Sequence, residues 1–124
     1  MDTNELLKRT KKFGYDCIDL SEYLFGNFLK NHVHGQLIRC STSVVANYRA
    51  ARLAQSEASF VAKISIIIEE VDESSLWLEM INDKNLLPKK FMSETNRLIK
   101  EANELTSIFI ATRKTMNNRI KHSK

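Results

Sequence analysis

The sequence predicts an all-α protein, an up-down-up-down antiparallel four-helix bundle that spans residues 1–124 as a single domain. Three observations lead to this prediction. The 124 residues include only three glycines and one proline, and so few helix-breaking residues favour long helices over many short strands. Apolar or small residues recur in steps of three and four along four segments, without the two-residue alternation of strands. The connections between these segments are short, which is typical of antiparallel neighbours in a bundle.

The first helix is expected over about residues 3–30 and the second over about residues 34–54. Asp2 or Thr3 can cap the start of the first helix, because short polar side chains accept hydrogen bonds from the first turn. The segment Lys30–Gly35, KNHVHG, is predicted to be the turn between the two helices. The predicted core stripes of these helices are Leu6, Thr10, Phe13, Cys17, Leu20 and Leu24, then Leu37, Ser41, Val44, Tyr48 and Ala51.

The third helix is expected over about residues 56–82 and the fourth over about residues 88–119. Ser56 is a suitable cap for the third helix, with Glu57 in its first turn. Asn82–Lys90 is the predicted turn, and Pro88 suits a first helical position. The predicted core stripes are Phe60, Ile64, Ile67, Val71, Ser74, Leu78 and Ile81, then Phe91, Thr95, Leu98, Ala102, Leu105, Phe109, Thr112 and Met116.

Charge is unevenly spread along the chain, although the net charge is only +4. Residues 1–32 are neutral overall, and residues 33–54 carry three arginines and no acid. Residues 55–84 carry two basic and seven acidic side chains, whereas residues 85–124 carry nine basic and three acidic ones. Such polarity arises when helices of opposite charge pair within one molecule, or when a basic face serves an anionic partner.

The segment Arg39–Ala51, RCSTSVVANYRAA, is unusual for a helix because its outward side carries small residues instead of Lys and Glu. Small side chains allow a second backbone to approach closely, either inside the bundle or in another subunit. If the contact joins subunits, the interface comprises Ser43, Ala46, Asn47 and Ala50. Asn47 would then need hydrogen-bond partners, and acids between Glu69 and Ser75 are candidates, with Asp72 expected to face inward. A buried acid could pair with Asn47 or with an arginine.

The order of small and polar residues in this region resembles the four-helix bundle family of the 23S ribosomal RNA intervening-sequence proteins. The resemblance covers about residues 30–115, and the first helix is only loosely similar. Tyr48 and Arg49 depart from it, because many relatives carry Glu after the Ala-Asn pair. The matching positions are Gln36, Leu37, Arg39, Ser43, Val44, Ala46, Asn47, Ala50, Ser56, Phe60, Lys63, Glu70, Asp72 and Glu73.

This resemblance implies an up-down four-helix bundle that assembles into a homo-oligomeric ring, typically a pentamer. The sequence also looks like the accessory proteins of diversity-generating retroelements, which share the fold and present basic surfaces to nucleic acid. The family is usually without demonstrated catalysis. The resemblance therefore implies an assembling, nucleic-acid-binding protein rather than an enzyme.

Motifs for catalysis or cofactor binding are missing from the sequence. It contains no glycine-rich phosphate loop of the GxxxxGK[ST] or GxGxxG type. His32 and His34 lack an evident third metal ligand nearby and are expected to be solvated turn residues. We therefore expect no catalytic residues, no metal, no cofactor and no enzymatic activity. Cys17 and Cys40 fall on apolar faces and are expected to be inert core thiols, and with no membrane-spanning run the expected location is the cytoplasm.

Clustered positive charge is the main functional indication, because phosphate binding needs cations but no special catalytic geometry. The expected partner is RNA or DNA, and a ring would multiply a modest patch into avidity. The alternative is a structural or scaffold protein whose ring binds a protein partner, with the charge serving as a solvated face. The candidate nucleic-acid-binding residues are Arg39, Arg49, Arg52, Arg113, Lys114 and Arg119.

Overall fold

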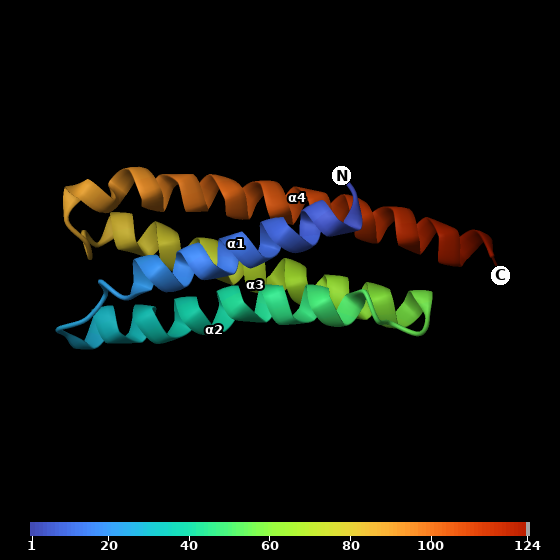
Figure 1. Ribbon diagram of the computed structural model, residues 1–124, viewed down its shortest axis with the longest axis horizontal. Coiled ribbons are helices and arrows are strands. Elements are labelled where there is room, and N and C mark those ends of the chain that lie inside the picture. Colours follow the sequence, from blue (N-terminus) through green and yellow to red (C-terminus); the bar gives the residue numbers. More distant parts are fainter. Residues whose placement is uncertain (124) are drawn as a thin grey trace.

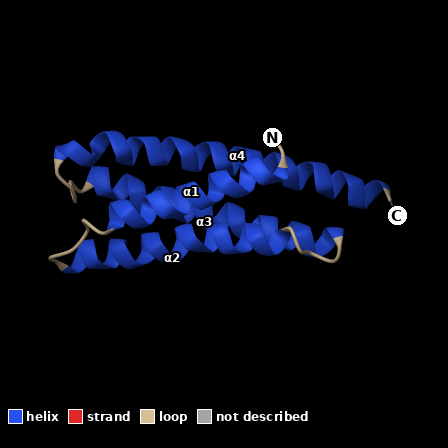
Figure 2. Cartoon of the chain, viewed as in Figure 1, coloured by secondary structure: helices blue, strands red, loops and turns tan. Residues whose placement is uncertain are grey.

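Residues 1–123 of the computed structural model form an antiparallel four-helix bundle with no strand in this range, which confirms the predicted fold class (Figures 1 and 2). Successive helices run in opposite directions (Figure 1), so the start of the chain, the turn between the second and third helices and the end of the fourth helix lie at one end of the bundle. The elements are α1 (Thr3–Ser21), α2 (Phe28–Ala51), α3 (Glu57–Asp83), a 3₁₀ turn η1 (Lys89–Phe91) and α4 (Met92–His122).

The core consists of the stripes that the three- and four-residue steps predict, because this spacing keeps side chains on one face of a helix. Every predicted stripe residue of the first two helices is buried, including Leu24 in the turn after α1. In α3 and α4 the central stripe residues are buried, whereas Phe60, Phe91, Thr112 and Met116 at the ends of the stripes are only half-buried. The bundle is therefore tightest in its middle.

The boundary between α1 and α2 differs from the prediction. α1 ends at Ser21 instead of about residue 30, and α2 begins at Phe28 instead of about residue 34. The predicted turn Lys30–Gly35 lies inside α2. The chain reverses at Gly26, whose φ of 113° is accessible mainly to glycine. Asn27 then caps α2, because its side-chain oxygen accepts a hydrogen bond from the Lys30 amide at 2.9 Å.

The other helix ends differ less from the prediction. α2 ends at Ala51 instead of about residue 54, and α3 covers Glu57–Asp83. Ser56 caps α3 as predicted, accepting a hydrogen bond from the Ser59 amide at 3.0 Å. Pro88 precedes the 3₁₀ turn instead of opening α4, which begins at Met92 and continues to His122, three residues beyond the predicted end.

Candidate nucleic-acid interface

Five of the six predicted nucleic-acid-binding cations lie toward one end of the bundle. Arg49 is in the last turn of α2 and Arg52 follows it, while Arg113, Lys114 and Arg119 belong to the last third of α4. α2 and α4 run in the same direction, so both helices finish at the end where the chain begins (Figure 1). We call these five residues the basic end.

Few acidic residues oppose the basic end: Asp2 and Glu5 at the start of α1 and Glu57 in the first turn of α3. The chain has no acidic residue after Glu104. Within residues 1–123, only Arg119 of the five makes an ion pair, to Glu57 at a long 3.7 Å, and Arg113 donates to the Ser65 hydroxyl at 3.4 Å. Figure 1 shows the last turns of α4 extending beyond the turn that joins α2 to α3. The cations of the basic end are therefore accessible to an anionic partner.

The first half of α4 is different, because its charges pair with α1. Arg97 contacts Asp16 at 2.7 Å, and Arg9 of α1 contacts Glu101 at 2.7 Å and Glu104 at 2.5 Å. Burial acts to raise the pKa of Asp16, but hydrogen bonds from Lys12 and Arg97 outweigh it and leave that pKa lowered. Arg97 in the first half of α4 is thus paired with acids, whereas the cations in its last third are largely unpaired within residues 1–123.

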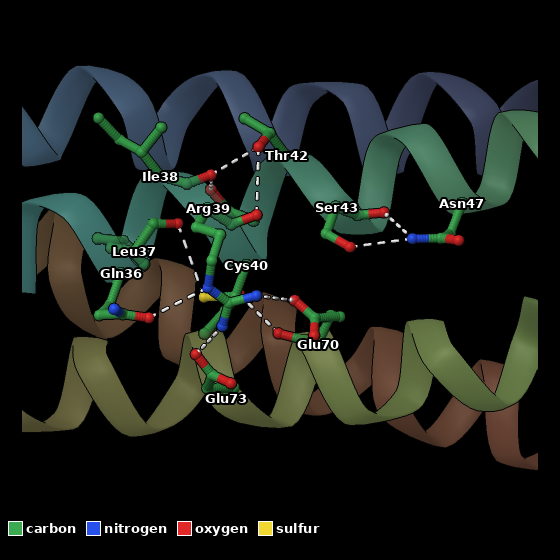
Figure 3. Close-up of polar contacts among 12 residues, drawn as sticks. Gln36, Leu37, Ile38, Arg39, Cys40, Thr42, Ser43, Asn47, Glu70 and Glu73 are labelled. Carbon is green, nitrogen blue, oxygen red and sulfur yellow. Dashed lines mark hydrogen bonds and ion pairs between the residues drawn. The ribbon is translucent and has the colours of Figure 1, made fainter.

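Arg39, the sixth predicted cation, lies apart from the basic end and pairs with acids of α3 (Figure 3). Its guanidinium donates to Glu70 at 3.0 Å and to Glu73, and its Nε donates to the Gln36 side chain at 3.1 Å. The Trp77 indole also donates to Glu73, at 3.1 Å. An arginine thus pairs with acids of α3, but Glu70 and Glu73 are half-buried and not the buried acid considered from the sequence. We leave Arg39 out of the interface because its charge is compensated.

The small-residue stripe of α2 is partly accessible. Ala46 is exposed, and Ser43, Asn47 and Ala50 are half-buried. The Asn47 amide donates to the Ser43 carbonyl and hydroxyl oxygens of its own helix, both at 2.9 Å (Figure 3). The predicted inward orientation of Asp72 is wrong, because this residue is exposed on α3. Asn47 therefore satisfies its donor locally, and Ala46 is the one stripe residue fully open to another molecule.

The histidine and cysteine side chains have structural environments. His34 was predicted to be solvated, but it is half-buried, and its Nδ1 lies 2.7 Å from the Ser21 carbonyl at the end of α1. Cys17 and Cys40 are buried free thiols, as predicted. Burial raises the pKa of Cys40 to about 11 and that of Cys17 further, so neither is a thiolate at neutral pH.

Residues 1–123 contain neither a cluster of metal-ligating side chains nor a membrane-spanning helix. No group of three or more His, Cys, Asp or Glu side chains is placed to hold a metal ion. None of the described helices is both long and apolar enough to cross a membrane.

Exposed aromatic side chains at the opposite end of the bundle were not anticipated from the sequence. Tyr23, Phe25 and Phe28 are 56%, 67% and 86% exposed around the turn between α1 and α2. Tyr23 packs on Phe91 with ring centroids 4.5 Å apart. They were not predicted because the first helix was expected to continue to about residue 30. Their clustering between Ser21 and Leu29, around Gly26, was the available signal.

The fold and its surfaces define a class of small helical-bundle proteins with a basic end and no recognisable reaction centre in the described residues. The family model for the 23S rRNA-intervening sequence protein matches residues 2–111. The chain belongs to this family.

A solved structure supports the same assignment. The chain is similar to the crystal structure of a protein with unknown function from the S23 ribosomal protein family of Bacteroides thetaiotaomicron VPI-5482, with 25% sequence identity and a TM-score of 0.79. The match covers 92% of this chain and 99% of that chain. No curated protein matches the chain.

Proposed function

We propose that the protein is a non-enzymatic, cytoplasmic homo-oligomer, a ring of typically five subunits, that binds RNA or DNA through the basic end. The observation that carries the proposal is the gathering of five cations at one end of the bundle. Within residues 1–123 only Arg119 of the five makes an ion pair, with Glu57 at 3.7 Å. Nucleic-acid backbones are polyanions, and clustered Lys and Arg side chains bind them by releasing condensed counterions. No catalytic geometry is needed for this activity.

Oligomerisation strengthens the proposal because one basic end offers few phosphate contacts. Repeating it around a ring would turn several weak contacts into avidity, provided that the basic ends share one face of the assembly. The exposed Ala46 and its half-buried neighbours on α2 provide a surface without large or charged side chains for close contact between subunits.

The alternative function is a scaffold ring that binds a protein partner. The exposed aromatics Tyr23, Phe25 and Phe28 favour it, because aromatic side chains are enriched at the cores of protein interfaces. They lie at the end opposite to the basic end, so the two functions can be tested separately.

The test is fluorescence anisotropy with labelled structured RNA and duplex DNA at several salt concentrations, with oligomer mass measured on the same sample. We expect affinity to fall steeply as salt increases, and the double variant Arg49→Gln/Arg113→Gln to bind about tenfold more weakly, because it removes two phosphate-binding cations per subunit. Arg39→Gln/Arg97→Gln removes the same number of charges and is the matched control. We expect it to retain the wild-type affinity within about twofold because acids already pair with both arginines.

Two results would contradict this proposal. Absence of binding even at low salt would exclude a phosphate-binding surface and favour the scaffold alternative. Equal losses in the two double variants would show that binding follows total charge rather than the basic end.

A further inference from the structure

A pocket of about 640 Å³ opens at the basic end of the bundle. Its walls come from the start of α1, the turn between α2 and α3, the first turn of α3 and the last third of α4. Phe60 and Met116 give it an apolar side. Its polar side chains include Tyr48, Arg52, Gln55 and Glu57. A pocket with one apolar wall and a few convergent polar groups is the usual form of a small-ligand site.

Tyr48 provides a fixed hydrogen-bond donor in this pocket. The residue is only 5% exposed, and its ring packs against Phe109 with centroids 5.5 Å apart. Burial and the charge of Asp2 raise the pKa of Tyr48, while the Thr3 side chain and the charge of Arg52 act in the opposite direction. Thr3 and Tyr48 both line the pocket. With a pKa above its ordinary value of 10.0, the Tyr48 hydroxyl is protonated at neutral pH.

Arg52 provides the positive charge. It follows the last residue of α2, is exposed, and makes no ion pair within residues 1–123. Its charge reaches Tyr48, as the effect on the tyrosine pKa shows. Arg49, three residues earlier in the chain, does not line the pocket. Substitution of Arg52 therefore tests binding in the pocket, whereas substitution of Arg49 tests only the electrostatic attraction of nucleic acid to the basic end.

The first turn of α3 adds to the positive potential of the pocket. Ser56 and Glu57 line it, and the Ser56 side chain caps only the Ser59 amide. The amides of Glu57 and Ala58 have no partner within the helix, as is usual for a first turn. The Glu57 carboxylate repels an anion in the pocket. Its ion pair with Arg119, at 3.7 Å, compensates part of this negative charge.

We infer that this pocket binds a phosphomonoester attached to an aromatic or apolar group, either the 5′-phosphorylated end of a nucleic-acid strand or a free nucleotide. Arg52 and the Tyr48 hydroxyl hold the phosphate, and the base lies against Phe60 and Met116. A terminal phosphate carries more charge than an internal phosphodiester and is therefore the preferred partner of Arg52. Recognition of a 5′-phosphorylated strand end rests on the proposed nucleic-acid binding, and it specifies which part of the strand the protein recognises.

The test uses fluorescence anisotropy of the full chain with a short single-stranded oligonucleotide labelled at its 3′ end, carrying either a 5′-phosphate or a 5′-hydroxyl. We expect the wild type to bind the phosphorylated strand about tenfold more tightly, the usual effect of one or two charge-assisted hydrogen bonds. Tyr48→Phe, which keeps the ring packing, and Arg52→Gln should both reduce this preference to about twofold. Arg49→Gln should weaken both strands equally and leave the preference unchanged.

Adenosine monophosphate distinguishes the two sources of the ligand. If it displaces the phosphorylated strand and its own binding weakens in Tyr48→Phe, the pocket takes free nucleotides as well as strand ends. If it fails to compete while the preference for the phosphorylated strand depends on Tyr48 and Arg52, the ligand is the strand end.

Failure of the inference is distinguishable from failure of the proposed function. Equal affinity for both strands, together with no binding of adenosine monophosphate, would overturn the pocket assignment and leave the basic end in place. Absence of binding to either strand and to structured RNA and duplex DNA would overturn the proposed function, and binding of adenosine monophosphate alone would then support only the nucleotide site. Circular dichroism of each variant checks that the helices are retained.

Discussion

The Glu73 carboxylate accepts hydrogen bonds from two donors, one on α2 and one on its own helix α3. The Arg39 guanidinium reaches it from α2 and the Trp77 indole from one turn further along α3. The hydrogen bond from Trp77, followed by the hydrogen bond and charge of Arg39, lowers the pKa of Glu73 below its ordinary value of 4.5. Because the folded-state pKa is depressed, this contribution to stability is complete above the unfolded pKa and is lost as pH falls through the folded value.

The single tryptophan of the chain can report this titration. We expect the Trp77 fluorescence to change on acidification with a midpoint below 4.5, because protonation of Glu73 weakens the bond from the indole. Glu73→Gln should abolish the transition. His32 lies edge-on to the indole with centroids 5.4 Å apart, so both proteins should carry His32→Gln to remove its influence. A transition of the same midpoint in the Glu73→Gln protein would contradict the assignment.

The pairing of Arg39 with Glu70 and Glu73 shows what residue-level sequence reasoning could and could not provide. The helical periodicity predicted that Arg39 points away from the core, and the acidic segment on the third helix was recognised as a source of partners. The particular acids depend on the axial register of α2 against α3, because the partners are 31 and 34 residues away in the chain. Asp72 is exposed because, two residues from Glu70, it lies on the opposite side of α3.

Among the helices, the close approach of α1 and α2 depends on Gly14. A Cβ atom there would lie 2.5 Å from the Val45 side chain and 3.2 Å from the Ser41 carbonyl oxygen. Gly35, although also helical, has nothing within 4 Å of such an atom. Two glycines in helices therefore have different roles, and only the first is required by packing.

We expect Gly14→Ala to lower the free energy of unfolding by about 1–3 kcal/mol, because α1 must move away from α2 to accommodate the methyl group. Gly35→Ala is the matched control and should raise it by about 0.5–1 kcal/mol, since alanine favours a helix without a clash. Urea unfolding followed by circular dichroism measures both. A Gly14→Ala protein as stable as the wild type would show that the two helices can separate without loss of packing.

Gly26 and Gly35 explain why the predicted boundary between the first two helices was wrong. The core stripes of all four helices were predictable, because burial follows the spacing of apolar residues regardless of where a helix ends. The turn was predicted at Lys30–Gly35, yet this segment is helical with Gly35 inside α2, and the chain reverses at Gly26. Composition alone does not distinguish a glycine that ends a helix from one that lies within it, whereas the cap at Asn27 does.

The distribution of charge over the whole molecule follows from topology. The sequence predicts basic second and fourth helices, but only the antiparallel arrangement brings Arg49 and Arg52 to the same end as the last third of α4. The same arrangement sets α1 beside the first half of α4, where Arg9 and Arg97 are neutralised. Which cations remain available is therefore a property of the assembled bundle.

Assembly of subunits is tested most directly at Ala46, the exposed residue of the α2 stripe. Because the side chain is outside the core, Ala46→Glu should leave the helix content unchanged. If the stripe joins subunits, each new carboxylate would be buried against the neighbouring subunit without a partner, and we expect the mass measured by light scattering to fall toward that of the 14.3 kDa monomer. Nucleic-acid affinity should fall with it, because avidity is lost and because the new carboxylate lies one helical turn from Arg49. Ala111→Glu makes the same change at an exposed position of α4 and should keep the wild-type mass. An unchanged mass in Ala46→Glu would remove the stripe from the interface, and equal dissociation of both variants would show that the surface of α2 is not specifically required.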